Sequence, residues 1–254
     1  MEVIAVINQK GGVGKTTTVN AIGEGLTLRG YKALYIDLDA QGNLSYTLGA
    51  ATSGLTAMDL LQGKPAQATI QRTEAGDIIA SSPSLAGADT IITTTGKEYR
   101  LKEALEPLSG LYDYCIIDTP PALGILAVNA LTACTGAIIP AQADIYSLQG
   151  ISQLHNTIET VKRYCNPALI IKGIVLTRYN SRAVISREVA EMIRQAAGQL
   201  QTKLYTAKIR ECTAINQPHP THHSISTPPP TTNAAADYTP LIAEILGKGE
   251  KTNA

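Results

Sequence analysis

A glycine-rich stretch near the start of the chain holds the first residues whose types and spacing point to chemistry. It runs from residue 8 to residue 18 and follows an apolar run at residues 3–7. A turn of this kind between a strand and a helix can place successive backbone N–H groups around a phosphate, while the helix N-terminus adds partial positive charge. We therefore predict a phosphate-binding site. Its candidate residues are Lys10, Gly11, Gly12, Val13, Gly14, Lys15, Thr16 and Thr17.

The spacing of the glycines departs from the strict phosphate-loop pattern G-x-x-x-x-G-K-[ST]. That pattern requires glycine at position 9, where this chain has Gln9, and the chain reads K-G-G-V-G-K-T-T instead. This segment resembles the deviant Walker A motif of the ParA/Soj partition ATPases, which belong to the MinD superfamily. A chance glycine-rich turn is the alternative, and the order of strand, loop and helix argues against it. The resemblance implies ATP and Mg²⁺ as cofactors.

Two aspartates, Asp37 and Asp39, stand at the end of a second apolar strand, which we predict at residues 33–37. If this strand neighbours the first one in a parallel sheet, its carboxyl end faces the ligand crevice and both carboxylates point at the γ-phosphate. A pair of solvated loop acids is the alternative. The surrounding segment, D-x-D-x-Q-G-N, resembles the second nucleotide motif of the partition ATPases.

A third apolar strand, at residues 114–118, also ends in an acid, Asp118, and a Thr-Pro-Pro turn follows it. A hydrophobic strand that ends in aspartate is typical of a Walker B site, where the acid holds Mg²⁺ or its water shell. The segment again resembles the family pattern. The resemblance implies a metal site in which Thr16 binds the ion while Asp37 and Asp118 order its waters.

The resemblance also implies the catalytic roles. Lys15 would hold the β- and γ-phosphates, and Asp39 would orient the attacking water. Lys10 would reach the nucleotide held by a partner subunit, so that activity requires a homodimer. Hydrolysis of this kind works by positioning and charge neutralisation rather than through a covalent intermediate.

The predicted strands and helices that must position the candidate site residues indicate one α/β domain spanning residues 1–254. We expect a doubly wound, mainly parallel sheet with helices on both faces and the nucleotide at the carboxyl ends of the strands, which is the P-loop NTPase fold that the resemblance implies. Strands are predicted at residues 2–8, 33–37, 78–79, 114–118, 137–140 and 169–177. Helices are predicted at residues 15–29, 56–61, 84–92, 97–106, 148–164 and 234–246, with a further one ending near residue 200.

The composition, with 44% hydrophobic and 17% charged residues, is that of a soluble globular protein. No apolar run reaches the roughly 18 residues that span a membrane, and no signal peptide precedes the first strand, so we expect a cytoplasmic protein. The four cysteines form no C-x-x-C pair, which favours buried thiols over a zinc site or a disulfide framework. A cluster bridged between subunits, as in the related nitrogenase iron protein, is the alternative. Because the chain has no Phe and no Trp, tyrosines and aliphatic side chains must fill the core.

The charge is unevenly distributed although the net charge is zero. Residues 160–210 hold 10 Lys and Arg against 2 Asp and Glu, whereas residues 1–159 hold 9 against 15. A local basic field attracts polyanions. We expect one side of the sheet to concentrate Arg178, Arg182, Arg187, Arg194, Lys203, Lys208 and Arg210. The resemblance marks this region as the one that contacts the DNA backbone, with Arg178, Arg182, Arg187 and Arg210 as the candidates; charges spread over a solvated surface are the alternative.

The resemblance falters after residue 215, at an atypical segment rich in Pro, His and Thr at residues 216–232. Five of the 13 prolines lie between residues 218 and 230, which forbids a helix there and predicts an extended or disordered stretch. Three histidines, His219, His222 and His223, raise the alternative of a metal site, which the absence of a nearby acid or cysteine disfavours. In relatives this region helps to enclose the base, so we expect its departure from the family pattern to alter adenine binding. The departure would also alter the DNA surface.

The function implied by the resemblance is an ATP-dependent dimerisation switch. The ATP-bound homodimer would bind DNA non-specifically on the nucleoid, and slow hydrolysis stimulated by a ParB/Spo0J-like centromere-binding partner would drive plasmid or chromosome partitioning. A MinD-like membrane-associated ATPase is one alternative, but the final predicted helix has no basic face, so we expect no membrane partner. A metabolic ATP-dependent enzyme, such as a relative of dethiobiotin synthetase, and a non-hydrolysing adaptor are the others.

Overall fold

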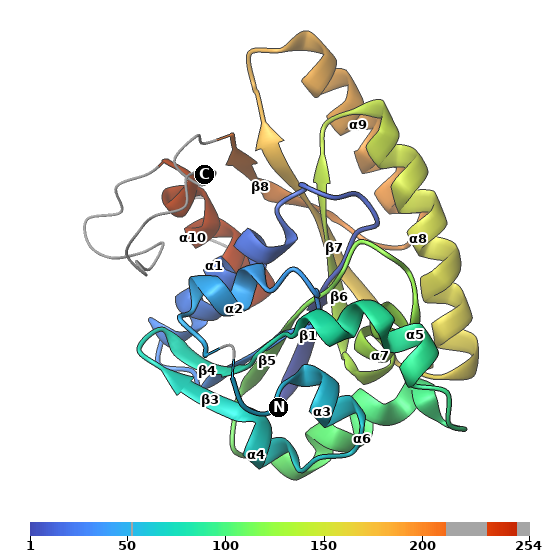
Figure 1. Cartoon of the computed structure of the whole chain (residues 1–254). Coiled ribbons are helices and arrows are strands. Elements are labelled where there is room, and N and C mark those ends of the chain that lie inside the picture. Colours follow the sequence, from blue (N-terminus) through green and yellow to red (C-terminus); the bar gives the residue numbers. More distant parts are fainter. Residues whose placement is uncertain (52, 212–232, 248–254) are drawn as a thin grey trace.

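One sheet of eight strands runs through the computed structural model, which describes residues 1–51, 53–211 and 233–247 (Figure 1). The strand order is β3-β4-β2-β5-β1-β6-β7-β8, and within this sheet only β3 and β4 pair in antiparallel fashion. The strands are β1 (Glu2–Val6), β2 (Ala33–Asp37), β3 (Ile70–Thr73), β4 (Gly76–Ile79), β5 (Tyr114–Asp118), β6 (Gly136–Gln142), β7 (Ile170–Tyr179) and β8 (Leu204–Arg210). The predicted doubly wound α/β class is confirmed.

Helices cover both faces of the sheet (Figure 1). The α-helices are α1 (Lys15–Thr27), α2 (Asn43–Thr47), α3 (Ala57–Leu61), α4 (Ala66–Thr69), α5 (Ala88–Ile91), α6 (Arg100–Leu105), α7 (Ile125–Ala133), α8 (Ile145–Tyr164), α9 (Val184–Gln199) and α10 (Asn233–Ile245). Short 3-10 turns lie at η1 (Pro83–Gly87), η2 (Lys97–Tyr99) and η3 (Glu106–Leu108). The apolar side chains of α1, α2 and α10 pack on one face, and those of α3 to α9 pack on the other.

The central strand β1 supplies both cores. Val3 and Ala5 point into the core beneath α3 to α9, whereas Ile4 and Val6 point into the core beneath α1 and α10. Alternate residues of a strand face opposite sides of its sheet, so a strand buried on both faces reads as a continuous apolar run. This is the pattern that the sequence shows before the glycine-rich loop.

Tyrosines fill the core positions that Phe or Trp would take in other proteins, as predicted. Tyr35 and Tyr205 are among the largest fully buried side chains, and each ring lies against a glycine. A Cβ at Gly23 would lie 2.2 Å from the ring of Tyr35, and a Cβ at Gly173 would lie 2.5 Å from the ring of Tyr205. Each glycine therefore makes room for a buried aromatic ring.

The structure differs from the sequence prediction in the pairing of one strand of the sheet. The prediction also missed several elements. The strand that carries Asp37 does not pair with β1, because β5 lies between them. The strands β3 and β8 and the helix α7 are among the elements that were not predicted. The antiparallel β3 is only four residues long, and α7 is buried almost throughout, so its sequence shows no polar face at helical spacing.

Further predictions concern the C-terminal part of the chain, the cysteines and possible metal or membrane-spanning segments. The segment at residues 216–232, with His219, His222 and His223, lies outside the described residues. The expected C-terminal helix is confirmed as α10, which packs on α1 and β8. The prediction of buried thiols is confirmed for Cys115 and Cys134, whereas Cys165 is only partly buried and Cys212 lies outside the described residues. In the described part of the chain, no group of three or more His, Cys, Asp or Glu side chains could hold a metal ion. The helices of that part lack an apolar stretch of the length that a membrane span requires.

Candidate nucleotide-binding site

The glycine-rich loop joins β1 to α1 at the carboxyl end of the central strand. Gly12 and Gly14 have positive φ angles of 73° and 83°, which favour glycine strongly over residues with a Cβ. Helix α1 begins at Lys15, and no side chain of the described residues caps its first turn. The backbone N–H groups at the start of α1 therefore point outward without a partner from a side-chain cap, which is the arrangement that binds an anion.

Three residues that were predicted for the site, Lys15, Thr16 and Asp118, lie close to one another beside this loop. Thr16 Oγ1 donates a hydrogen bond to Asp118 Oδ2 at 2.6 Å, and Lys15 Nζ lies 3.4 Å from the backbone carbonyl oxygen of Lys10. Burial lowers the pKa of Lys15, although Asp118 and Asp39 oppose this effect. Burial, followed by the charge of Asp37, raises the pKa of Asp118 to about 8. Burial therefore disfavours the charged forms of both Lys15 and Asp118.

The second carboxylate oxygen of Asp118 indicates whether these residues fit a nucleotide that is bound together with magnesium. Asp118 is 1% exposed, and its Oδ1 has no hydrogen-bond partner among the described residues. An unpaired buried carboxylate oxygen is costly unless a donor or a cation satisfies it. Oxygen ligands and retained waters are what Mg²⁺ prefers. Thr16 and Asp118 therefore fit a hydrated magnesium ion beside a phosphate held by the loop.

The two acids after β2 lie at the same edge of the sheet. Asp37 pairs in register with Asp118 across β2 and β5, so the inserted β5 still brings the two carboxylates together. Asp37 is fully buried, and burial raises its pKa despite hydrogen bonds from Ser45 and from the backbone of Asp39. Asp39 is half-buried, and its Oδ1 accepts a hydrogen bond from the N–H of Gln41 at 3.0 Å.

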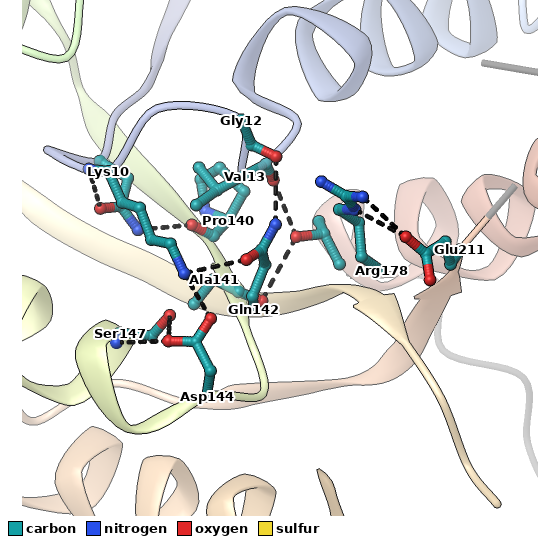
Figure 2. Close-up of polar contacts among 12 residues, drawn as sticks. Lys10, Gly12, Val13, Pro140, Ala141, Gln142, Asp144, Ser147, Arg178 and Glu211 are labelled. Carbon is teal, nitrogen blue, oxygen red and sulfur yellow. Dashed lines mark hydrogen bonds and ion pairs between the residues drawn. The ribbon is translucent and has the colours of Figure 1, made fainter. Parts of the chain in front are cut away.

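Lys10 reaches across the loop to the end of β6 (Figure 2). Its ammonium group forms an ion pair with Asp144 and donates to Gln142 Oε1 at 2.9 Å. Gln142 in turn donates through Nε2 to the carbonyl oxygen of Gly12 at 3.2 Å. Asp144 also caps α8, because its Oδ1 accepts from the N–H of Ser147 at 2.9 Å. The ammonium group of Lys10 is therefore held by Asp144 and Gln142 of its own subunit, while its backbone carbonyl oxygen faces Lys15.

Other residues that sequence reasoning did not assign to the site hold the loop in place. Thr177 Oγ1 donates to the carbonyl oxygen of Val13 at 2.7 Å. Asn8 donates through Nδ2 to the carbonyl oxygen of Pro140 at 2.7 Å and accepts from the N–H of Lys10 at 3.0 Å. Thr177 lies near the carboxyl end of β7. The signal that could have found it is its position at the strand edge where the loop must lie.

The candidate DNA-binding arginines lie beyond this site, around the ends of β7 and β8. Arg178 is the next-to-last residue of β7, and Arg210 ends the neighbouring strand β8; both are exposed. Arg182 and Arg187 are exposed on the following loop and on α9. Lys203 precedes β8 whereas Arg210 ends it, so the expected concentration does not include Lys203.

Two of these arginines are paired with acids. Arg178 donates to Glu211 at 2.7 Å (Figure 2), and Arg210 donates to Asp237 at 2.7 Å.

The comparisons with known proteins agree with this geometry. A family model described as an AAA domain matches residues 1–171. The chain is 35% identical to the sporulation initiation inhibitor protein Soj of Bacillus subtilis, with 98% of this chain and 99% of that protein covered. It is 37% identical to the chromosome partitioning protein ParA of Myxococcus xanthus, with 85% and 80% covered.

Solved structures show the same fold. Cobyrinic acid a,c-diamide synthase from Mycobacterium smegmatis, with bound ADP and magnesium, matches with a TM-score of 0.80 at 34% identity, covering 96% of this chain and 95% of that one. A complex of a Cyanothece McdA variant with ATP matches with a TM-score of 0.86 at 24% identity, covering 100% and 99%.

The parallel sheet and the loop between β1 and α1 define a P-loop nucleotide-binding protein. Within that class, the chain belongs to the ParA/Soj family of chromosome-partitioning proteins, one of whose members carries the name chromosome-partitioning ATPase Soj.

Proposed function

We propose that this chain is an ATPase whose ATP-bound homodimer binds DNA non-specifically and serves plasmid or chromosome partitioning. The observation that carries the proposal is the cluster of Lys15, Thr16 and Asp118 beside the loop, together with a second lysine on the same loop, Lys10, whose ammonium group pairs with Asp144 instead. One lysine is placed to neutralise phosphate within the subunit. The other can serve a second nucleotide once its own ion pair opens.

The residues of the site divide the work of hydrolysis. Mg²⁺, when bound, would neutralise the charge that develops on the phosphates. Lys15 neutralises the phosphates, while Thr16 and Asp118 hold the ion and its waters. Asp37 was expected to order the waters of the ion, but three hydrogen bonds from protein donors occupy its carboxylate, so we propose instead that it keeps the acid-bearing loop in order. Asp39 orients the attacking water from its half-buried position.

Dimerisation couples the nucleotide to DNA. In the dimer, Lys10 leaves Asp144 and reaches the phosphates held by the partner subunit. Two copies of the surface carrying Arg178, Arg182, Arg187 and Arg210 then act together, so the number of phosphate contacts doubles. Because such contacts release counterions, affinity for DNA falls steeply as the salt concentration rises, and it depends little on sequence.

A centromere-binding protein of the ParB/Spo0J kind is the proposed partner. It stimulates an otherwise slow hydrolysis, which returns the chain to the monomer and releases DNA. The proposed location is the nucleoid in the cytoplasm. A second candidate function is a metabolic enzyme that couples ATP to a small-molecule substrate, because a solved structure at 34% identity is named cobyrinic acid a,c-diamide synthase.

Co-sedimentation with DNA tests the proposal directly. The wild-type chain, Lys10→Ala and the control Lys64→Ala, which changes an exposed lysine remote from the loop, are compared with ATP, with ADP and without nucleotide at two salt concentrations. We expect binding only with ATP, weaker binding at the higher salt, and loss of binding in Lys10→Ala alone. Absence of DNA binding in every nucleotide state would favour the metabolic candidate, and lipid flotation would test a membrane partner.

A further inference from the structure

A hydrogen-bonded network connects three separate segments beneath the acid-bearing loop. Asp37, at the end of β2, accepts from both the N–H of Ser45, at 2.9 Å, and its hydroxyl group, at 2.8 Å. The hydroxyl oxygen of Ser45 accepts in turn from the N–H of Ser81 at 2.9 Å, and the Ser81 hydroxyl donates to the carbonyl oxygen of Asp39. Ser45 lies on α2 and Ser81 follows β4, and both are buried.

The carboxylate of Asp37 is largely committed to this network. Besides the two hydrogen bonds from Ser45, it accepts one from the N–H of Asp39 at 3.1 Å. A carboxylate offers about four acceptor positions, so protein donors take most of them. Asp118 contrasts with it, because its Oδ1 has no partner among the described residues. The two acids therefore contribute differently: Asp118 is open toward an ion, whereas Asp37 organises the chain around itself.

The network fixes the backbone of Asp39 from two sides. Its carbonyl oxygen accepts from the N–H of Gly42 at 2.9 Å, which closes a turn, as well as from Ser81. The side chain closes the same turn by accepting from Gln41. Asp39 itself is half-buried, and the charge of its carboxylate acts on Lys15. The backbone that carries this carboxylate is thus held in part by the hydroxyl group of Ser81, which lies outside the nucleotide motifs.

We propose that Ser45 and Ser81 are positioning residues for Asp39, an inference that rests on the proposed ATPase function. Replacing Ser81 with alanine removes the donor to the Asp39 carbonyl, and replacing Ser45 removes both a donor to Asp37 and the acceptor of the buried Ser81 N–H. A buried polar group left unpaired loosens the segment that depended on it. Small errors in the placement of a catalytic group cost large factors in rate.

Hydrogen exchange measures the positioning without any need for turnover. Ser45→Ala, Ser81→Ala and the control Ser84→Ala are compared in the full chain; Ser84 is exposed, and its hydroxyl forms a hydrogen bond with that of Ser82. We expect backbone amides at residues 39–45 to exchange at least about fivefold faster in the first two variants and unchanged in the control. Equal exchange in all three variants would overturn the inference.

Turnover measures the consequence for catalysis. We expect Ser81→Ala to lower kcat about tenfold while KM for ATP stays within about twofold, and Ser81→Thr, which keeps a hydroxyl, to recover most of the loss. A merely structural role would instead lower the melting temperature and the active fraction.

Single-turnover hydrolysis in an Asp39→Ala background completes the test, because there the loss of Ser81 should have no further effect. A further tenfold loss in that background would contradict action through Asp39. A wild-type chain that binds but does not hydrolyse ATP would overturn the proposed function and the catalytic half of this inference, while the exchange result still decides whether the serines order the loop.

Discussion

Lys10 and Asp144, which lie 134 residues apart, form an ion pair between the phosphate loop and the N-terminus of α8 (Figure 2). The same carboxylate caps that helix through Ser147. Partial burial opposes ionisation, yet the Lys10 ammonium and the Ser147 donors hold the pKa of Asp144 below its ordinary value. The lysine that we propose to act between subunits is therefore paired within its own subunit, and the proposed dimerisation would break this pair.

Asp144→Asn should favour the ATP-bound dimer. Asparagine still accepts the hydrogen bond that caps α8, but it no longer carries the charge that retains Lys10. A partly exposed ion pair contributes up to about 1 kcal/mol, and a symmetric dimer would break one pair in each subunit, so we expect dimerisation with ATP to tighten by up to about 30-fold. Sedimentation velocity over a range of protein concentrations measures this. Asp144→Ala serves as the comparison, because it loses the cap as well and should be less stable by about 1 kcal/mol. An unchanged dimer dissociation constant in Asp144→Asn would show that the ion pair does not oppose dimerisation.

Asp237→Asn should strengthen binding to DNA. Asp237 on α10 receives hydrogen bonds from both the Nε and the Nη2 atoms of Arg210, so it competes with phosphate for this arginine. Removing its charge should raise the DNA affinity of the ATP-bound state about two- to fivefold and steepen the salt dependence. Glu74→Gln makes the same change of charge in the turn between β3 and β4, at the opposite edge of the sheet, and should have little effect. Filter binding at several salt concentrations measures both variants; equal affinities would exclude Arg210 from the DNA surface.

The site was predictable from the sequence wherever a function depends on a short segment. Each motif is recognisable from an apolar strand and the residues at its carboxyl end: the glycines of the loop, Asp37 at the end of β2 and Asp118 at the end of β5. Local patterns of this kind also predicted α1, α8 and α10 to within a few residues.

What could not be predicted depends on contacts between distant segments. The insertion of β5 between β1 and β2 follows from crossover connections, which leave no mark on either strand. The pairing of Lys10 with Asp144 and the network through Ser45 and Ser81 join polar residues from separate elements. Each of these residues alone reads as an ordinary polar residue at a strand end or a helix end.

Gly173→Ala should destabilise the protein although the change is small. The added Cβ would lie 2.5 Å from the buried ring of Tyr205, and neither the strand nor the ring has space to move freely in a close-packed interior. We expect a loss of about 1–3 kcal/mol in the free energy of unfolding. Gly198→Ala, at a helical position where a Cβ meets nothing within 4 Å, is the control and should be neutral or stabilising by up to about 1 kcal/mol. Urea denaturation compares the two; an equal effect of both changes would contradict the packing argument.

Asp118→Asn should make the nucleotide-free protein more stable at pH 8 than the wild type. The pKa of Asp118 is raised from 3.8 to about 8 by burial and by Asp37, so between these pH values the folded chain holds a proton that the unfolded chain has lost. The free energy of unfolding of the wild type therefore falls as the pH rises through this window.

Asparagine does not ionise, so its advantage should grow from near zero at about pH 4 to at least about 1 kcal/mol at about pH 8. Asp37, whose pKa burial also raises, remains in both proteins and gives the variant a residual slope. Urea denaturation between about pH 4 and about pH 9 measures the difference. Adding ADP and Mg²⁺ should reverse the order at the alkaline end, because only the wild type offers a carboxylate to the ion. If the free energy of unfolding of the two proteins changed with pH in parallel, this would show that Asp118 ionises in the folded chain with no loss of stability.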